Sequence, residues 1–117
     1  MTTFQVHYEL AKHNAEVSKS LKSEFVGWSI VVLYYAAIHW VNGFLIKNYP
    51  SEFQPSGHKS RLDFVSRKVP ALYKPLRQLE AESEKIRYEP PYWKNIDAKT
   101  AKNIENDYEK IKRDTNQ

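Results

Sequence analysis

The hydrophobic pattern of this chain is dominated by one stretch, residues 25–46, which contains no Asp, Glu, Lys or Arg. It stands in a chain of 117 residues of which 27% are charged and whose mean hydropathy is −0.70. A helix that is apolar on nearly every side must be buried, either by other helices or by lipid. The pattern therefore predicts a long helix over residues 24–48 at the centre of the fold.

Four further stretches carry apolar residues at spacings of three and four, which is typical of amphipathic helices. They span residues 4–22, 58–68, 71–88 and 98–114. Proline-containing loops are expected at residues 48–57 and 89–96. No stretch alternates apolar and polar residues between hairpin turns, so no strand is expected. The sequence predicts an all-α, up-and-down bundle of four long helices and one short helix, in a single domain over residues 1–117.

Steps of three and four residues also indicate which side of each helix is buried. In the first helix the expected buried side consists of Phe4, Ala11, Val17 and Leu21, with Leu10 alongside. In the fourth helix it consists of Leu72, Leu76, Leu79, Ser83 and Ile86. Thr2 and Gln5 have the spacing of a capping box before the first helix, and Asp97 is a typical N-cap for the last. The tail from Asp114 onward is expected to fray.

A membrane span is the alternative for the central stretch, because its length is sufficient and Lys22 and Lys47 flank it. Against a span, His39 and Asn42 would lie in or near hydrocarbon without a second span to pair with them. The amphipathic stretches elsewhere in the chain are available to cover the central helix. We therefore expect a buried core helix and no contact with a membrane.

Composition narrows the classes of function that the chain can serve. It has no cysteine, which excludes disulfides, zinc–thiolate sites and cysteine nucleophiles and suits a reducing compartment. The N-terminal residues lack the apolar core of a signal peptide, and a cytoplasmic protein is expected. The formal net charge of +4 permits a phosphate-bearing partner without requiring one.

The motifs of several common enzyme classes are missing from the sequence. With three glycines, the chain has no P-loop and no dinucleotide-binding loop. It has no HExxH motif, no carboxylate–histidine pairs of a di-iron bundle and no nucleophile elbow. His39 and His58 are too few for a metal site, which needs three or four converging ligands. Glu80 and Glu84 are expected to face solvent, so we assign no catalytic residue, metal or cofactor.

A polar seam is expected on the central helix, because Tyr35, His39 and Asn42 follow one another at steps of three and four. His39 is either a buried histidine paired with Tyr35, Asn42 or a backbone carbonyl, or part of a pocket between helices that binds phosphate. His7, on the charged first helix, is expected at the surface or rim. Gly43 lies beside Asn42, and a glycine inside a helix indicates close approach of a neighbouring backbone.

Two arginines and a group of aromatic residues are further candidates for binding. Arg87 lies near the apolar side of the fourth helix, and Arg61 lies one turn after His58. Each arginine either forms a salt bridge or binds a phosphate or carboxylate through two parallel hydrogen bonds. The aromatic candidates are Tyr88, Tyr92 and Trp93, followed by Lys94. These aromatic rings either stack on bases, or they cover the end of the bundle or form a dimer contact.

Several short motifs, taken in order, resemble those of a HEPN domain. The motifs are Ala11, His13 and Asn14; Trp28 with residues 31–45 (VVLYYAAIHWVNGFL); residues 58–61 (HKSR); Leu72 and Tyr73; and residues 83–88 (SEKIRY). The motifs cover nearly the whole chain. Their order and spacing are most similar to those of the small, stand-alone prokaryotic and archaeal HEPN proteins. The fold of that family, a bundle of four or five helices, agrees with the bundle expected from the hydrophobic periodicity.

The resemblance implies a set of functions and partners. HEPN proteins pair as homodimers through central helices, bind nucleotides or RNA, and act beside nucleotidyltransferases in toxin–antitoxin or defence systems. Ribonuclease members carry an Arg followed a few residues later by a His on a late helix, and all four histidines of this chain precede its late arginines. The ribonuclease activity is therefore not carried over. The polar positions that match the family pattern are His39, His58, Arg61, Arg87 and Tyr88.

We therefore expect a non-catalytic binding module for a nucleotide or RNA phosphate or for a partner protein. Its expected ligand-binding residues are Tyr35, His39, Asn42, His58, Arg61, Arg87 and Tyr88. One alternative is a metal-independent ribonuclease in which His39 or His58 acts with Arg87. Another is an antitoxin-type partner whose polar residues only hold the core together. A homodimer is expected in all three cases, because apolar surface left uncovered on the central helix marks a contact.

Overall fold

The computed structural model describes residues 3–116, and every regular element in them is helical. The four long helices are α1 (Phe4–Leu21), α2 (Val26–Asn48), α4 (Tyr73–Tyr88) and α5 (Ala98–Thr115). The short helix is α3 (His58–Lys68), and two 3-10 turns, η1 (Pro70–Leu72) and η2 (Tyr92–Asn95), flank α4. The predicted all-α bundle of four long helices and one short helix is confirmed.

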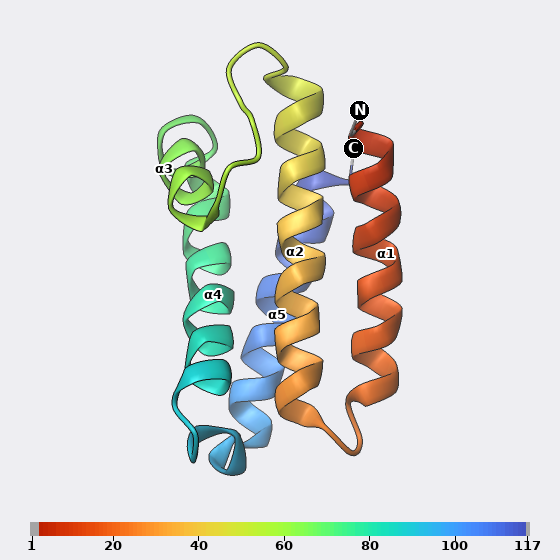
Figure 1. The fold of residues 1–117 in the computed structure, drawn as a ribbon, viewed down its shortest axis with the longest axis vertical. Coiled ribbons are helices and arrows are strands. Elements are labelled where there is room, and N and C mark those ends of the chain that lie inside the picture. Colours follow the sequence, from red (N-terminus) through yellow and green to blue (C-terminus); the bar gives the residue numbers. More distant parts are fainter. Residues whose placement is uncertain (1–2, 117) are drawn as a thin grey trace.

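The helices form an elongated bundle with α2 in the middle (Figure 1). Helix α1 packs along one side of α2, α3 and α4 lie on the other side, and α5 lies behind (Figure 1). The bundle measures 43 × 25 × 22 Å, so its long axis follows the four long helices. Which helix a side chain on α2 contacts therefore depends on the direction in which that side chain points.

Helix α2 supplies more of the core than any other helix. Its fully buried side chains include Tyr34, Trp40, Val41 and Leu45. Helix α2 is also long and apolar enough to cross a membrane by length and composition alone, with a mean hydropathy of 1.6 over its most apolar window. Of that window, 72% is buried inside the fold. The prediction of a central, buried helix is thus confirmed, with the first helical residue at Val26.

The predicted buried side is confirmed for α4 and in part for α1. All five positions predicted for the fourth helix are buried. In α1 the predicted Ala11 is fully buried, Phe4, Val17 and Leu21 are half-buried, and Leu10 is exposed. The other fully buried residues of α1 are His7 and Ser18, which hydrophobic spacing did not indicate because both are polar.

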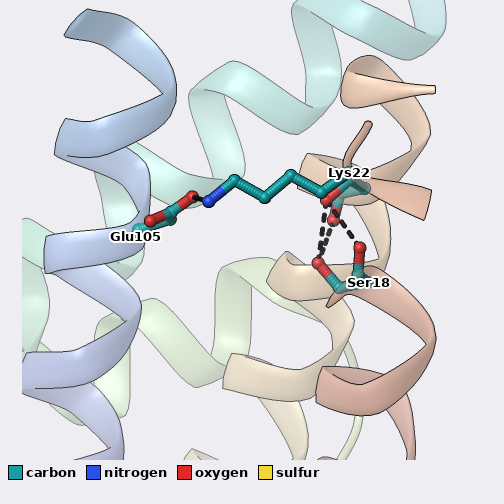
Figure 2. A network of polar contacts seen from close by, with 4 residues as sticks. Ser18, Lys22 and Glu105 are labelled. Atoms are coloured by element: carbon teal, nitrogen blue, oxygen red, sulfur yellow. Dashed lines mark hydrogen bonds and ion pairs between the residues drawn. The ribbon is translucent and has the colours of Figure 1, made fainter. Parts of the chain in front are cut away.

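One polar contact between α1 and α2 is reciprocal (Figure 2). The Ser18 hydroxyl donates to the backbone oxygen of Ser29 at 2.7 Å, and the Ser29 hydroxyl donates to the backbone oxygen of Ser18 at 2.9 Å. Both side chains are buried, and each hydroxyl finds an acceptor, as buried polar groups require. Beside this pair, an ion pair between Lys22 and Glu105 joins the end of α1 to α5 (Figure 2).

The helix ends agree in part with the sequence signals. Asp97 caps α5 as predicted, accepting from the backbone N–H of Thr100 at 2.8 Å. Thr2 lies outside the described residues, and the residue that caps α1 is Thr3, whose hydroxyl oxygen accepts from the backbone of Val6. The predicted fraying is wrong for Thr115, which is buried and helical because Tyr8 donates to its backbone oxygen at 2.8 Å.

Gly43 lies on α2 in close contact with the first two turns of α1. A Cβ atom at Gly43 would lie 2.6 Å from a ring carbon of Tyr8 and 3.2 Å from the backbone oxygen of Phe4. The Tyr8 ring is held by its hydrogen bond to Thr115 and by packing on Trp40, with ring centroids 5.0 Å apart. The predicted close approach is confirmed, and its nearest atoms belong to a fixed side chain.

We predict that Gly43→Ala destabilises the protein by at least about 1 kcal/mol net, because overpacking of about 1–3 kcal/mol outweighs the gain in helix propensity. Gly27→Ala is the matched control, since its nearest neighbour, the Ile86 methyl at 3.3 Å, is less crowded. Urea unfolding of the two variants and the wild type provides the comparison. A more stable Gly43→Ala variant would contradict the close approach.

Candidate functional site

The predicted polar seam of α2 is present, and its three members bind to three different helices. Tyr35 contacts Arg87 of α4, His39 contacts His7 of α1, and Asn42 contacts Arg61 of α3. The positions follow one face of α2 as expected, but that face lies where several helices meet. The seam is therefore a set of three separate junctions along one helix.

Arg61 is a buried cation with neutral partners. Its side chain is only 7% exposed. Its Nε donates to Asn42 Oδ1 at 2.8 Å, and its Nη1 donates to His58 Nδ1 at 3.0 Å. Among residues 3–116, no Asp or Glu oxygen lies within 4.0 Å of its guanidinium. Burial lowers the pKa of Arg61, with Tyr34 and Glu80 acting in the opposite direction, but a guanidinium stays protonated in proteins.

The contact with Arg61 fixes the proton position on His58. A guanidinium N–H can only donate, so His58 Nδ1 accepts and the proton of the neutral ring lies on Nε2. The Tyr34 hydroxyl also lies 2.9 Å from Nδ1 and donates to it in this tautomer. Burial, and then the charges of Arg61 and Arg87, lower the pKa of His58, although Glu84 acts in the opposite direction. His58 thus remains a neutral ring with an N–H donor on its second nitrogen.

Arg87 forms a second group of contacts on the same side of α2. Its Nε donates to the Ser83 hydroxyl at 3.1 Å, and its Nη1 donates to the hydroxyls of Tyr35 and Tyr88 at 3.4 and 3.3 Å. The guanidinium also lies over the Tyr88 ring, 4.9 Å from its centroid. No ion pair joins Arg87 to a carboxylate among the described residues. Because Arg87 and Arg61 both lower the pKa of His58, the two arginines act on one region.

His39 has a partner that the sequence did not indicate. Its Nδ1 lies 2.9 Å from Nδ1 of His7, so one of the two nitrogens carries the proton and the other accepts it. The expectation of a surface position for His7 is wrong, because its ring is buried against α2 and its Nε2 has no hydrogen-bond partner among the described residues. Burial lowers the pKa of both histidines, and the nearby charge of Arg61 adds to this effect.

The structure therefore divides the predicted site residues into three groups. The first contains Asn42, His58 and Arg61; the second contains Tyr35, Arg87 and Tyr88; the third is His39 with His7. The three surface hollows found between the helices are lined by other residues, so these groups do not share one of those hollows. No cluster of three or more metal-ligating side chains lies within residues 3–116.

Sequence reasoning missed Tyr34 and His7 as members of these groups. Tyr34 and Asn42 are eight residues apart and share a face of α2, which is a signal that periodicity contains. The signal was hidden because a tyrosine in an apolar run resembles any core aromatic. For His7 the sequence holds no comparable signal, since its partner lies 32 residues away on another helix.

We predict that the stability of the protein falls as the pH drops below about 6.5, the ordinary histidine pKa. The folded-state pKa values of His7 and His39 are lowered, so the unfolded chain binds protons first as the pH falls. Stability is thus complete above the unfolded-state pKa and declines below it. Urea unfolding at pH 7.5 and 5.5 measures this decline.

The control for this prediction is a pair of histidine variants on the same helix. His7→Gln should reduce the pH dependence, because it removes one of the buried rings, whereas His13→Gln at the exposed side of α1 should leave it unchanged. Equal pH dependence in wild type and His7→Gln would contradict the assignment of the effect to the buried pair.

Comparisons of this chain with protein-family models, with curated proteins and with solved structures found no match. The resemblance to HEPN domains therefore rests on the motifs of the sequence itself, together with the helical bundle. What the protein binds has to be inferred from the positions and charges of its own side chains.

Proposed function

We propose that this protein is a non-catalytic, HEPN-like binding module that binds a phosphate group of a nucleotide or of RNA. The phosphate site consists of Arg61, His58 and Arg87, on the side of α2 that faces α3 and α4. Three donor nitrogens of different side chains make no hydrogen bond with the described residues: Nη2 of each arginine and Nε2 of His58.

The observation that carries this proposal is the buried guanidinium of Arg61, which has no carboxylate oxygen within 4.0 Å among the described residues and feels the charge of Glu80 only from a greater distance. Removing a charge from water is costly unless an opposite charge or sufficient hydrogen bonds replace the lost solvation. Asn42 and His58 supply hydrogen bonds but no negative charge. A phosphate oxygen supplies both, and arginine binds phosphate in a two-pronged, charge-assisted geometry.

The proton position on His58 supports binding over ribonuclease chemistry. A general base needs an unprotonated nitrogen within reach of the hydroxyl that it deprotonates. In His58 the unprotonated Nδ1 already accepts from Arg61, and the remaining Nε2 carries a proton. A neutral Nε2–H is instead a suitable donor to a phosphate oxygen.

The partners of the proposed module follow from the HEPN resemblance. They are a second copy of the chain, which would form a homodimer, and a nucleotidyltransferase-type protein in a toxin–antitoxin or defence system. The absence of cysteine is consistent with work in the cytoplasm. No catalytic step, metal or cofactor is part of this proposal.

We predict that Arg87→Ala weakens the binding of adenosine monophosphate by about tenfold or more, because it removes a charge-assisted contact worth about 1.5–3 kcal/mol. Arg113→Ala is the matched control: it removes the same charge from an exposed position on α5. Isothermal titration at low salt measures both affinities, and raising the salt should weaken binding by wild type. Equal affinity of the two variants would contradict the assignment of the site.

Asn42→Asp tests the missing negative charge directly. The substitution keeps the shape of the side chain and places a carboxylate against Arg61 Nε, which is 2.8 Å from the present amide oxygen. We predict that this variant is at least as stable as wild type and binds adenosine monophosphate at least about tenfold more weakly, because Arg61 is then neutralised from within.

The control for this substitution is Asn42→Leu, which should destabilise the fold by about 1–3 kcal/mol by leaving a buried donor unpaired. Urea unfolding and calorimetric titration give the two measurements for each variant. If Asn42→Asp were less stable than wild type and still bound the nucleotide with unchanged affinity, Arg61 would not be the uncompensated charge that holds the phosphate.

A further inference from the structure

The donor nitrogens of the proposed phosphate site that make no hydrogen bond within the protein are open to solvent. They are Nη2 of Arg61, Nη2 of Arg87 and Nε2 of His58. Among residues 3–116, His7 Nε2 is the one side-chain nitrogen or oxygen that is both buried and without a hydrogen-bond partner. The three donor nitrogens are therefore reachable from outside, although the side chains that carry them are buried or half-buried.

Contacts along one turn of α2 connect the two arginines. Tyr34 and Tyr35 are neighbours on α2, and their rings pack with centroids 5.5 Å apart. The Tyr34 hydroxyl donates to His58 Nδ1, which also accepts from Arg61. The Tyr35 hydroxyl accepts from Arg87. Because α3 and α4 lie on the same side of α2 (Figure 1), these contacts hold both guanidinium groups in one region of the surface.

The acceptors next to these donors already receive hydrogen bonds. His58 Nδ1 accepts from Arg61 and Tyr34, and Asn42 Oδ1 accepts from Arg61 Nε. Burial raises the pKa of Tyr34, so its hydroxyl keeps its proton and stays a donor. Among the described residues, no carboxylate oxygen lies within 4.0 Å of a side-chain nitrogen of His58, Arg61 or Arg87. At contact distance the site therefore presents positive charge and N–H donors.

Two carboxylates of α4 act on the site from farther away. Against the effect of burial, Glu80 raises the pKa of Arg61, and Glu84 raises that of His58. Both carboxylates lie beyond 4.0 Å of these nitrogens. Distance and screening by water and salt weaken their repulsion of a bound anion relative to the attraction by guanidinium groups in contact with it.

Phosphate monoesters and phosphodiesters present different groups to such a set of donors. A terminal phosphate monoester has three oxygens that accept hydrogen bonds, and its charge approaches −2 above a second pKa of about 6. A phosphodiester inside a strand carries a single negative charge. A phosphate oxygen that keeps a proton is itself a donor and needs an acceptor. Two guanidinium groups and three donor nitrogens therefore match a doubly ionised terminal phosphate better than either alternative.

We infer that this site selects a doubly ionised terminal phosphate, the monoester group at the end of a nucleotide or of a strand, over a phosphodiester within a strand. The inference rests on the proposed phosphate-binding function and narrows its ligand. Arg61 and Arg87 supply the two positive charges, and the Nε2–H of His58 donates to the third oxygen. A nucleic acid is then bound by its phosphorylated end and not along its backbone.

Two matched pairs of ligands test this selection by isothermal titration at low salt and pH 7.5. Adenosine monophosphate and 3′,5′-cyclic adenosine monophosphate share base and sugar, but the cyclic nucleotide holds a phosphodiester. The RNA hexamer A6 with a 5′-phosphate differs from A6 with a 5′-hydroxyl only in the terminal monoester. Each ligand is measured with wild type, with Arg87→Ala and with Arg113→Ala, which removes an exposed arginine of α5 as the matched control.

We expect wild type to bind each monoester at least about tenfold more tightly than its partner, as expected for the loss of one charge-assisted contact. Arg87→Ala should bring both ratios close to one, and Arg113→Ala should leave both unchanged. Similar affinities for adenosine monophosphate and the 5′-phosphorylated hexamer would support the terminal phosphate as the group recognised in both. Tighter binding of that hexamer than of the nucleotide would support the end of a strand as its source.

The pH dependence tests the second charge of the ligand. The ratio of the affinities for adenosine monophosphate and its cyclic form should rise about three- to fourfold from pH 5.5 to 7.5, because a monoester with a second pKa of about 6 is only about one quarter doubly ionised at pH 5.5. The cyclic nucleotide corrects for the protein's own titrating groups at the site: Tyr34 on α2, His58 and Arg61 on α3, and Glu80, Glu84 and Arg87 on α4. A ratio that does not change with pH would overturn the selection of the doubly ionised form.

Three further results would overturn the inference. Equal binding of the two nucleotides, both weakened by Arg87→Ala, would leave the phosphate site in place without its selectivity. Equal binding of the two hexamers, again weakened by Arg87→Ala, would make an internal phosphodiester the ligand. Selectivity that persists in Arg87→Ala would place its origin outside this site. Failure of wild type to bind any of the four ligands would overturn the proposed function and this inference together.

Discussion

The structure depends on the burial of α2, a helix that is covered on most sides and yet carries polar side chains along its length. A buried polar group without a partner costs free energy comparable to a lost hydrogen bond. Each polar side chain on α2 therefore determines what the facing helix must supply at that level. Ser29 is matched by Ser18, His39 by His7, and Asn42 by Arg61. These pairings align the surrounding helices on α2 more specifically than apolar contact alone would.

The same requirement places two cations beside α2. Arg61 attaches the short helix α3 to the central helix, and Arg87 attaches the last turn of α4 to Tyr35. In both cases the partner on α2 is neutral, so the contact satisfies hydrogen bonds without an ion pair, and among the described residues the nearest compensation for Arg61 comes from the charge of Glu80, which lies beyond 4.0 Å. Arg61 holds α3 against α2 through Asn42. In the function that we propose, the same residue also binds an anion.

Much of the fold could be predicted because it follows from local periodicity. The extent of α3, the buried side of α4 and the cap of α5 at Asp97 all depend on residues that are close in sequence. The buried side of α1 could be predicted only in part: Ala11 follows the rule, whereas His7 and Ser18 are polar where the rule expects apolar residues. The polar residues of the seam contact three different helices because of packing between segments that are distant in sequence. The spacing of residues on α2 carries no information about that packing.

We propose that the guanidinium groups of Arg61 and Arg87 bind a phosphate together. The most direct measurement is a nuclear magnetic resonance titration that follows the side-chain Nε–H signals of the arginines as inorganic phosphate is added. The account predicts that the signals of Arg61 and Arg87 shift with one common midpoint, while the signal of the exposed Arg113 follows only the weak response of a surface charge. Signals of Arg61 and Arg87 that stay in place, or that move no more than that of Arg113, would contradict it.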